Sequence, residues 1–123
     1  MIEFRFHDSF EKEIAALEKR RLRYIRESLK GFQKLCEFHF HPTSPESRIA
    51  PGKLHRVTQN DMWSMWKTEL PVIKSGLRPG QFPRIWFVQS GATIAFICIS
   101  SHGDNYRDGT MDAIALSRVT DLF

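Results

Sequence analysis

The stretch that decides the fold is RIWFVQSGATIAFICISS, residues 84–101. Two apolar runs, Phe82–Gln89 and Thr93–Ser101, have the length and the β-branched and aromatic content of buried strands. Ser90-Gly91 separates them by the short spacing of a tight hairpin turn. The sequence therefore predicts two neighbouring antiparallel strands here.

Two further strands are expected before this hairpin, over Lys53–Val57 and Met62–Leu70, with turn residues between them. Strands that follow one another through short turns form an antiparallel meander. After the hairpin, residues 102–106 have the composition of a loop. A short last helix is expected to open at Asp108 or Thr110 and to run to Leu122.

The N-terminal part begins with alternating apolar and polar side chains over Ile2–His7, which predicts a strand with one buried face. Asp8 and Ser9 are candidate N-caps for the helical pattern that follows. From Phe10 onward apolar residues recur at helical spacing. Periodicity alone leaves open one long helix or two helices that join near residues 19–21. Residues 38–51 hold three prolines and are expected to form a loop.

Length and charge restrict the class of protein. The 123 residues suit a single α+β domain, residues 1–123, with one core. The formal net charge is +4, and residues 41–90 carry seven Lys and Arg against three Asp and Glu. A cationic central part fits a polyanionic partner, because Lys and Arg attract phosphates and release their counterions.

The remaining composition favours a soluble cytoplasmic protein. The charged start of the chain is not expected to be a signal peptide, and the longest apolar run, Ile94–Ile99, is shorter than the roughly 20 residues that span a bilayer. Cys36 and Cys98 lie far apart in apolar segments, as expected for free thiols in a reducing compartment. His39 and His41 have no third ligand nearby, so neither a metal nor a cofactor is expected.

The order of these elements resembles the RelE/ParE superfamily of bacterial toxins, and the resemblance covers nearly the whole chain. The segments that carry it are Ser9–Glu13, Pro42–Pro45, Gly52–Arg56, Met62–Trp66, Arg84–Val88 and Gly91–Ile97. Residues 101–106, SHGDNY, resemble a sub-group with His-Asp-x-x-Tyr after the last strand, here with Gly103 interposed. The Arg-rich C-terminal end of the best-understood ribonuclease members is missing.

The resemblance implies a helical hairpin after the first strand and a toxin of a type II toxin–antitoxin system. Such a toxin is neutralised by a cognate antitoxin protein in a hetero-oligomer. Members of the superfamily include ribosome-dependent messenger RNA endonucleases, and this is the activity we expect. The alternatives are a non-catalytic poison of DNA gyrase and an inactive interaction module of the same fold.

Cleaving RNA without a metal requires a base for the 2′-hydroxyl, a cation for the phosphate and an acid for the leaving 5′-oxygen. The candidate catalytic residues are Arg84, His102, Tyr106, His55 and Lys53. Arg84 is expected to bind the phosphate through two N–H groups. His55 or His102 is expected to act as the base, and Tyr106 or the other histidine as the acid. Metal-dependent cleavage is disfavoured, because Asp61 and Glu69 are the meander's only carboxylates.

Each candidate also has a structural interpretation. Arg84 could form a surface salt bridge or stack on a tryptophan, while His102 and Tyr106 could simply close the last strand. Alternation along a strand places Lys53 and His55 on one face and Arg56 on the other. The tryptophans Trp63, Trp66 and Trp86 fill a core more often than they stack on a base.

A basic helical surface is the expected RNA contact outside the catalytic residues. Its members are Lys19, Arg23, Arg26, Lys30 and Lys34, and Arg56 is a further candidate RNA-binding residue. The same surface could instead be a solvated helix face, or it could receive an acidic segment of the antitoxin.

Overall fold

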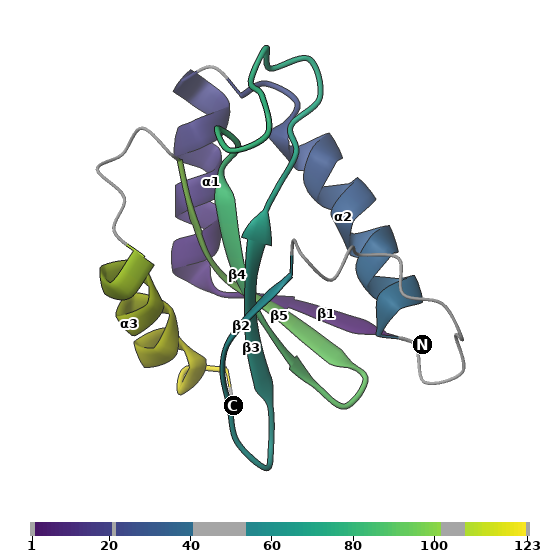
Figure 1. Ribbon diagram of the computed structural model, residues 1–123, viewed down its shortest axis with the longest axis vertical. Helices are drawn as coiled ribbons and strands as arrows, with labels where there is room; N and C mark the ends of the chain where they lie inside the picture. Colours follow the sequence, from purple (N-terminus) through teal and green to yellow (C-terminus); the bar gives the residue numbers. More distant parts are fainter. Residues whose placement is uncertain (1, 21, 41–53, 102–107, 123) are drawn as a thin grey trace.

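The computed structural model describes residues 2–20, 22–40, 54–101 and 108–122, which form three helices and one five-stranded sheet (Figure 1). The elements in chain order are β1 (Glu3–Phe6), α1 (Asp8–Arg20), α2 (Ile25–His39), β2 (His55–Gln59), β3 (Ser64–Glu69), β4 (Arg84–Ser90), β5 (Thr93–Ser100) and α3 (Asp108–Val119). The expected α+β class is confirmed.

The sheet is open and mixed, with the strand order β1-β5-β4-β3-β2. Strands β2 to β5 pair antiparallel with their neighbours in the chain, as the turn residues predicted. Strand β1 instead adds to the far side of β5 in parallel, with Glu3 opposite Thr93 and Phe6 opposite Phe96. The strand pattern did not predict this pairing, because it joins segments about 90 residues apart.

The β4–β5 hairpin turns through Gly91 and Ala92, since Ser90 and Thr93 are the last paired residues. Gly91 has a φ of +57°, a conformation that costs glycine nothing and other residues about 1 kcal/mol or more. A positive φ at the first of two turn residues is the geometry of a type II′ hairpin. The expected tight hairpin is confirmed, with its turn one residue later than expected, at Gly91-Ala92 instead of Ser90-Gly91.

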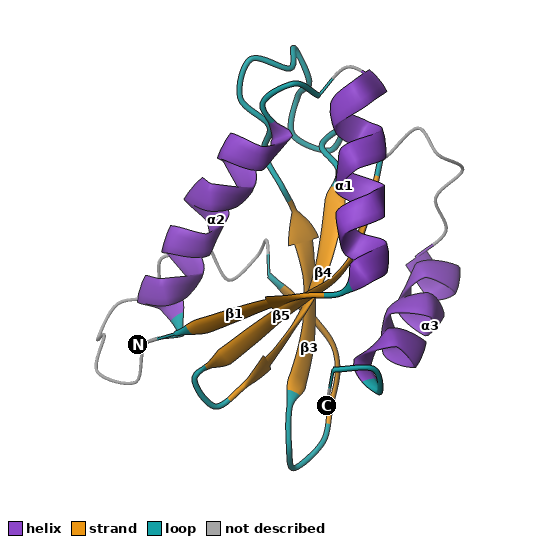
Figure 2. Cartoon of the chain, turned by 180° about the vertical axis from the view of Figure 1, so that it is seen from behind, coloured by secondary structure: helices purple, strands orange, loops and turns teal. Residues whose placement is uncertain are grey.

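Two hydrophobic cores lie on the two faces of the sheet. Helices α1 and α2 cover one face (Figure 2), where Phe96 stacks 5.8 Å from Phe10 and Phe87 meets Phe32 edge-on at 5.6 Å. Helix α3 covers part of the other face and packs Ala115 and Val119 against the sheet. Because both faces are covered, β4 and β5 are apolar on both sides, which explains their continuous hydrophobic runs.

The helical segment divides into two helices, as the family resemblance implied. Leu22 is only 8% exposed between them, donates its N–H to the Leu17 carbonyl at 3.2 Å and accepts from Ile25 at 3.0 Å. Burial of this side chain turns the chain without any Gly or Pro. Such a break depends on tertiary packing, so periodicity could not locate it.

Several element boundaries differ from the expected ones. Strands β3 and β4 begin two residues late, helix α3 ends at Val119 instead of Leu122, and α2 extends to His39, past the expected loop start at residue 38. Side chains set two further boundaries. Helix α1 begins at Asp8, and His7 rather than Asp8 or Ser9 caps it, because the Ser9 N–H donates to His7 Nδ1 at 3.1 Å. Strand β2 continues past the expected end at Val57 to Gln59. The Asn60 side chain then accepts two backbone N–H groups, at 2.8 and 2.9 Å, and starts the turn.

Helix α3 is fixed to α1 by an ion pair across β5. Arg118 donates to both carboxylate oxygens of Glu13, at 2.9 and 3.0 Å, and also to the Ile97 carbonyl at 3.1 Å. Glu13 in turn accepts the Ile99 N–H at 3.3 Å. These bonds join α1, β5 and α3, so the two layers of helices meet around one side of the sheet.

Both cysteines are buried free thiols. Burial raises the pKa of Cys36, and it raises the pKa of Cys98 to about 12. Thiols in such surroundings stay protonated at neutral pH and behave as small apolar side chains. Among the described residues, no helix combines the length and the hydropathy that crossing a membrane requires.

Candidate functional site

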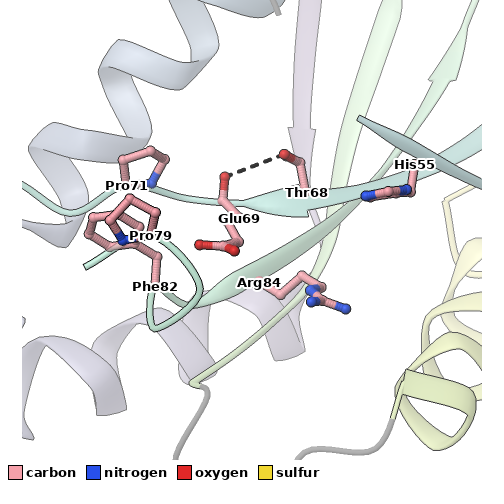
Figure 3. Close-up of a pocket in the computed structure, with 7 residues that line it drawn as sticks. All are labelled: His55, Thr68, Glu69, Pro71, Pro79, Phe82 and Arg84. Carbon is pink, nitrogen blue, oxygen red and sulfur yellow. Dashed lines mark hydrogen bonds between the residues drawn. The ribbon is translucent and has the colours of Figure 1, made fainter. Parts of the chain in front are cut away.

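A pocket of about 140 Å³ lies where β3 ends and β2 and β4 begin. Its lining residues are His55, Thr68, Glu69, Pro71, Pro79, Phe82 and Arg84 (Figure 3). Antiparallel pairing brings these strand ends together at one end of the sheet, because Glu69 lies opposite Arg84 and Lys67 lies opposite His55. The long connection from β3 to β4 closes the pocket.

Arg84 is partly buried in the pocket and is not turned into the hydrophobic interior. It opens β4 between Glu69 of β3 and Ser100 of β5. Its strand neighbour Ile85 packs into the core under α1 and α2. Alternation therefore places Arg84 on the sheet face that α3 partly covers, at the end of that face nearest the pocket.

His55 and Arg56 lie on opposite faces of β2, as alternation predicted. His55 is exposed and lines the pocket together with Arg84. Arg56 instead donates to the Gln59 side chain at 2.9 Å and lies 6.0 Å from the centroid of the Trp66 ring. Arg56 therefore belongs to the α2 side of the sheet and is not part of the pocket.

Three of the expected catalytic residues, Lys53, His102 and Tyr106, lie outside the described residues. Whether they converge with Arg84 stays a prediction. The structure thus brings together two of the five candidates, Arg84 and His55.

A polar cluster next to the pocket was missed by the sequence argument. Asp112 of α3 accepts a hydrogen bond from Trp86 Nε1 at 2.7 Å, and Lys67 Nζ approaches its two oxygens at 3.2 and 3.3 Å. Trp86 is fully buried, and the Lys67 side chain is 15% exposed. A signal for Lys67 was present, because Met65, Lys67 and Glu69 alternate along β3 and must share one face. The sequence contained no such signal for Asp112, because its contacts depend on where α3 packs against the sheet.

Glu69 fixes the connection that forms one wall of the pocket. Both of its carboxylate oxygens accept the Gly80 N–H, at 3.1 and 3.0 Å. Gly80 has a φ of +92°, so the turn after Arg78 needs a glycine at this position. A bond between Gln81 N–H and the Arg78 carbonyl, 2.9 Å long, closes the same turn.

The described part of this surface carries balanced charge. Two cations, Arg84 and Lys67, lie near two carboxylates, Glu69 and Asp112. Lys67 and Asp112 pair with each other, so the charged groups that the pocket offers a ligand are Arg84 and Glu69, one of each sign.

The basic residues expected on one helical face lie on three separate segments. Lys19 belongs to α1, Arg23 to the turn, and Arg26, Lys30 and Lys34 to α2. Both helices and the turn between them thus contribute basic residues, and their contact with RNA stays a prediction. All except Arg26 are exposed.

Arg26 has a structural role within the helical hairpin. It reaches from α2 to Glu11 at 3.3 Å and to Glu18 at 3.2 Å, both on α1. These bonds hold the two helices together at the surface of the domain.

Within residues 2–20, 22–40, 54–101 and 108–122, no group of three or more metal-ligating side chains is present. His39 ends α2 beside Phe40, and burial lowers its pKa. His41 lies outside the described residues.

No family model matches the chain, and no curated protein or solved structure shows significant similarity to it.

Proposed function

We propose that this chain is the toxin of a bacterial type II toxin–antitoxin system, and that it cleaves messenger RNA at the ribosome without a metal. The observation that carries the proposal is the shared pocket of Arg84 and His55, a guanidinium and an imidazole at one end of the sheet. These groups can supply the cation and the proton acceptor that RNA cleavage needs.

In the proposed reaction His55 or His102 removes the proton from the ribose 2′-hydroxyl. The 2′-oxygen then attacks the adjacent phosphorus, and the 5′-oxygen leaves with a proton from Tyr106 or from the other histidine. The products are a 2′,3′-cyclic phosphate and a 5′-hydroxyl. Arg84 stabilises the crowded phosphate through two parallel N–H groups, and Lys53 is a further cation for the same phosphate.

The proposed protein partner is a cognate antitoxin in the cytoplasm. The exposed Lys19, Arg23, Lys30 and Lys34 offer it a cationic surface on the helical side of the domain, where an acidic segment can bind by charge complementarity. Ribosomal RNA could occupy the same surface. A direct test of the partner is whether the protein encoded by the adjacent reading frame co-purifies with this chain.

A non-catalytic binding toxin, such as a gyrase poison or an inactive module, is the second candidate. The balanced charge of Arg84, Lys67, Glu69 and Asp112 favours it, because a protein surface offers both signs of charge and an RNA backbone offers one.

The two candidates differ in a cleavage assay. Purified chain is incubated with a messenger RNA, with and without ribosomes, and the 5′ ends of the products are mapped. The nuclease proposal predicts cleavage only with ribosomes and its loss in Arg84→Ala. Arg5→Ala is the matched control, because Arg5 lies on the edge strand β1, which β5 separates from β4, and it does not line the pocket. Intact RNA under both conditions, with folded wild-type protein, would favour the binding toxin.

A further inference from the structure

The pocket beside Arg84 has two chemically different sides. Pro71, Pro79 and Phe82 lie together on one side of the Glu69 carboxylate (Figure 3). Arg84 lies on its other side. An apolar wall with an aromatic ring gives a surface against which a planar ring can pack, whereas a bare phosphate gains nothing from it. The occupant that uses both sides is therefore a planar ring with a polar edge.

The size of the pocket limits what this ring can be. About 140 Å³ is well below the roughly 300–1,000 Å³ of sites that enclose drug-sized ligands. The space suits one base of an RNA strand, and it leaves the ribose and the phosphate outside.

The Glu69 carboxylate determines which polar edge fits. Its two oxygens share the single N–H of Gly80, at 3.1 and 3.0 Å, while an ionised carboxylate has about four lone-pair sites. Acceptor capacity is therefore left over on both oxygens. A carboxylate repels phosphate and cannot donate, so the ligand must present N–H groups to it.

Among the four RNA bases, guanine meets this requirement best. Its Watson–Crick edge carries two adjacent donors, N1–H and the N2 amino group, at the spacing of the two oxygens of one carboxylate. Uracil has one N–H between two carbonyls, and adenine and cytosine each have a single amino group with an acceptor beside it. Those three bases make one hydrogen bond to Glu69 where guanine makes two.

We infer that this pocket binds an unpaired guanine base, with Glu69 accepting from N1–H and the N2 amino group and Phe82 on the apolar side of the ring. The inference rests on the proposed function for its substrate, RNA, and it adds a specificity-determining residue, Glu69, that none of the expected catalytic roles includes.

The test uses free nucleotides as probes of the full chain. GMP, AMP, CMP and UMP are titrated separately, and the dissociation constants are measured by calorimetry or NMR. A bidentate contact to a base is worth about 1–3 kcal/mol of discrimination, which corresponds to GMP binding about 10-fold more tightly than the others. The inference is wrong if all four nucleotides bind equally. It is also wrong if GMP does not bind at concentrations up to about 10 mM, which corresponds to a binding free energy near −3 kcal/mol.

The variant Glu69→Gln tests the role of the Glu69 carboxylate. The amide keeps an oxygen for the Gly80 N–H but turns an NH₂ group toward the donors of guanine, so the preference for GMP should fall about 10-fold, to none. Glu3→Gln is the matched control, because the Glu3 side chain is 61% exposed on the far edge strand and should keep the preference. Preference retained in Glu69→Gln contradicts the assignment.

A second measurement needs no variant. In wild-type protein, GMP should shift the backbone amide resonances of Gly80 and Phe82 more than that of Gly91, which lies in the hairpin turn at the other end of β4. Larger shifts at Gly91 overturn the inference. If the chain arrests growth but shows no preference for GMP, the guanine inference is wrong and the proposed function stands. If it prefers GMP but does not arrest growth, the guanine inference stands and the proposed function is wrong.

Discussion

Replacing Asp112 by alanine is expected to weaken the attachment of α3 to the sheet. The carboxylate accepts the Trp86 Nε1–H at 2.7 Å and pairs with Lys67 at 3.2 Å. Trp86 is fully buried, so its indole N–H loses a charge-assisted hydrogen bond worth about 1–3 kcal/mol. The Lys67 side chain is 15% exposed and Asp112 27%, so the cost of desolvating both groups offsets most of the Coulombic attraction and leaves the ion pair about 1 kcal/mol.

These contributions give a loss of about 2–4 kcal/mol in the free energy of unfolding for Asp112→Ala. For a domain of this size, that loss lowers Tm by roughly 10 °C. Asp112→Asn should lose about half as much, because its amide oxygen still accepts from Trp86 but carries no charge for Lys67. Urea and thermal unfolding followed by far-UV circular dichroism measure both variants.

The matched control is Asp121→Ala. Asp121 also pairs across elements, with His7 Nε2 at 2.7 Å, but its side chain is 63% exposed. Exposed pairs contribute about 0–1 kcal/mol, so this variant should stay close to wild type. A stability of Asp112→Ala within about 0.5 kcal/mol of wild type, or equal to that of Asp121→Ala, would show that the Asp112 contacts do not anchor α3.

Further predictions concern the thiols and the glycines. In the native protein at pH 8, Cys36 and Cys98 should not react with a thiol reagent, because burial raises their pKa. Both thiols should react once the protein is unfolded in denaturant. Rapid reaction of the native protein would contradict their burial. Gly91→Ala should destabilise by about 1 kcal/mol, since its φ is +57°, whereas Gly31→Ala in the exposed middle of α2 should stabilise by up to about 1 kcal/mol. Urea unfolding measures the change in the free energy of unfolding for each glycine variant. Equal changes in the two variants would show that backbone conformation does not determine them.

The sequence predicted the elements whose signals are local. The β4–β5 hairpin and the antiparallel order of β2 to β5 follow from turn residues and apolar runs, and the structure confirms them, with the turn at Gly91-Ala92. The end of β2 was wrong by two residues because the Asn60 side chain starts the turn only after Gln59. Boundaries of this kind depend on one side-chain bond.

Features that depend on tertiary packing could not be predicted from periodicity. The break between α1 and α2 depends on the burial of Leu22, and β1 pairs with a strand about 90 residues away. The division into two helices was predicted only from the family resemblance, and the parallel pairing of β1 was not predicted.

The candidate site was predicted in part. Arg84 and His55 line one pocket, and alternation placed Arg56 on the other face correctly. The position of Glu69 opposite Arg84 and the ion pair of Asp112 with Lys67 were not predicted. A sequence shows which residues alternate along one strand, but the residue opposite each of them follows from the pairing register, and the contact of Asp112 follows from the docking of α3.

The most direct test of the account is growth of bacteria that express this chain under tight control. Wild-type chain should arrest growth within a few generations, and Arg84→Ala should restore it while its circular dichroism spectrum and Tm stay those of a folded domain. Arg5→Ala, on the far edge of the sheet, should remain toxic. Undiminished arrest by folded Arg84→Ala protein, or normal growth with abundant folded wild-type chain, would contradict the claim that the Arg84 pocket carries a toxic activity.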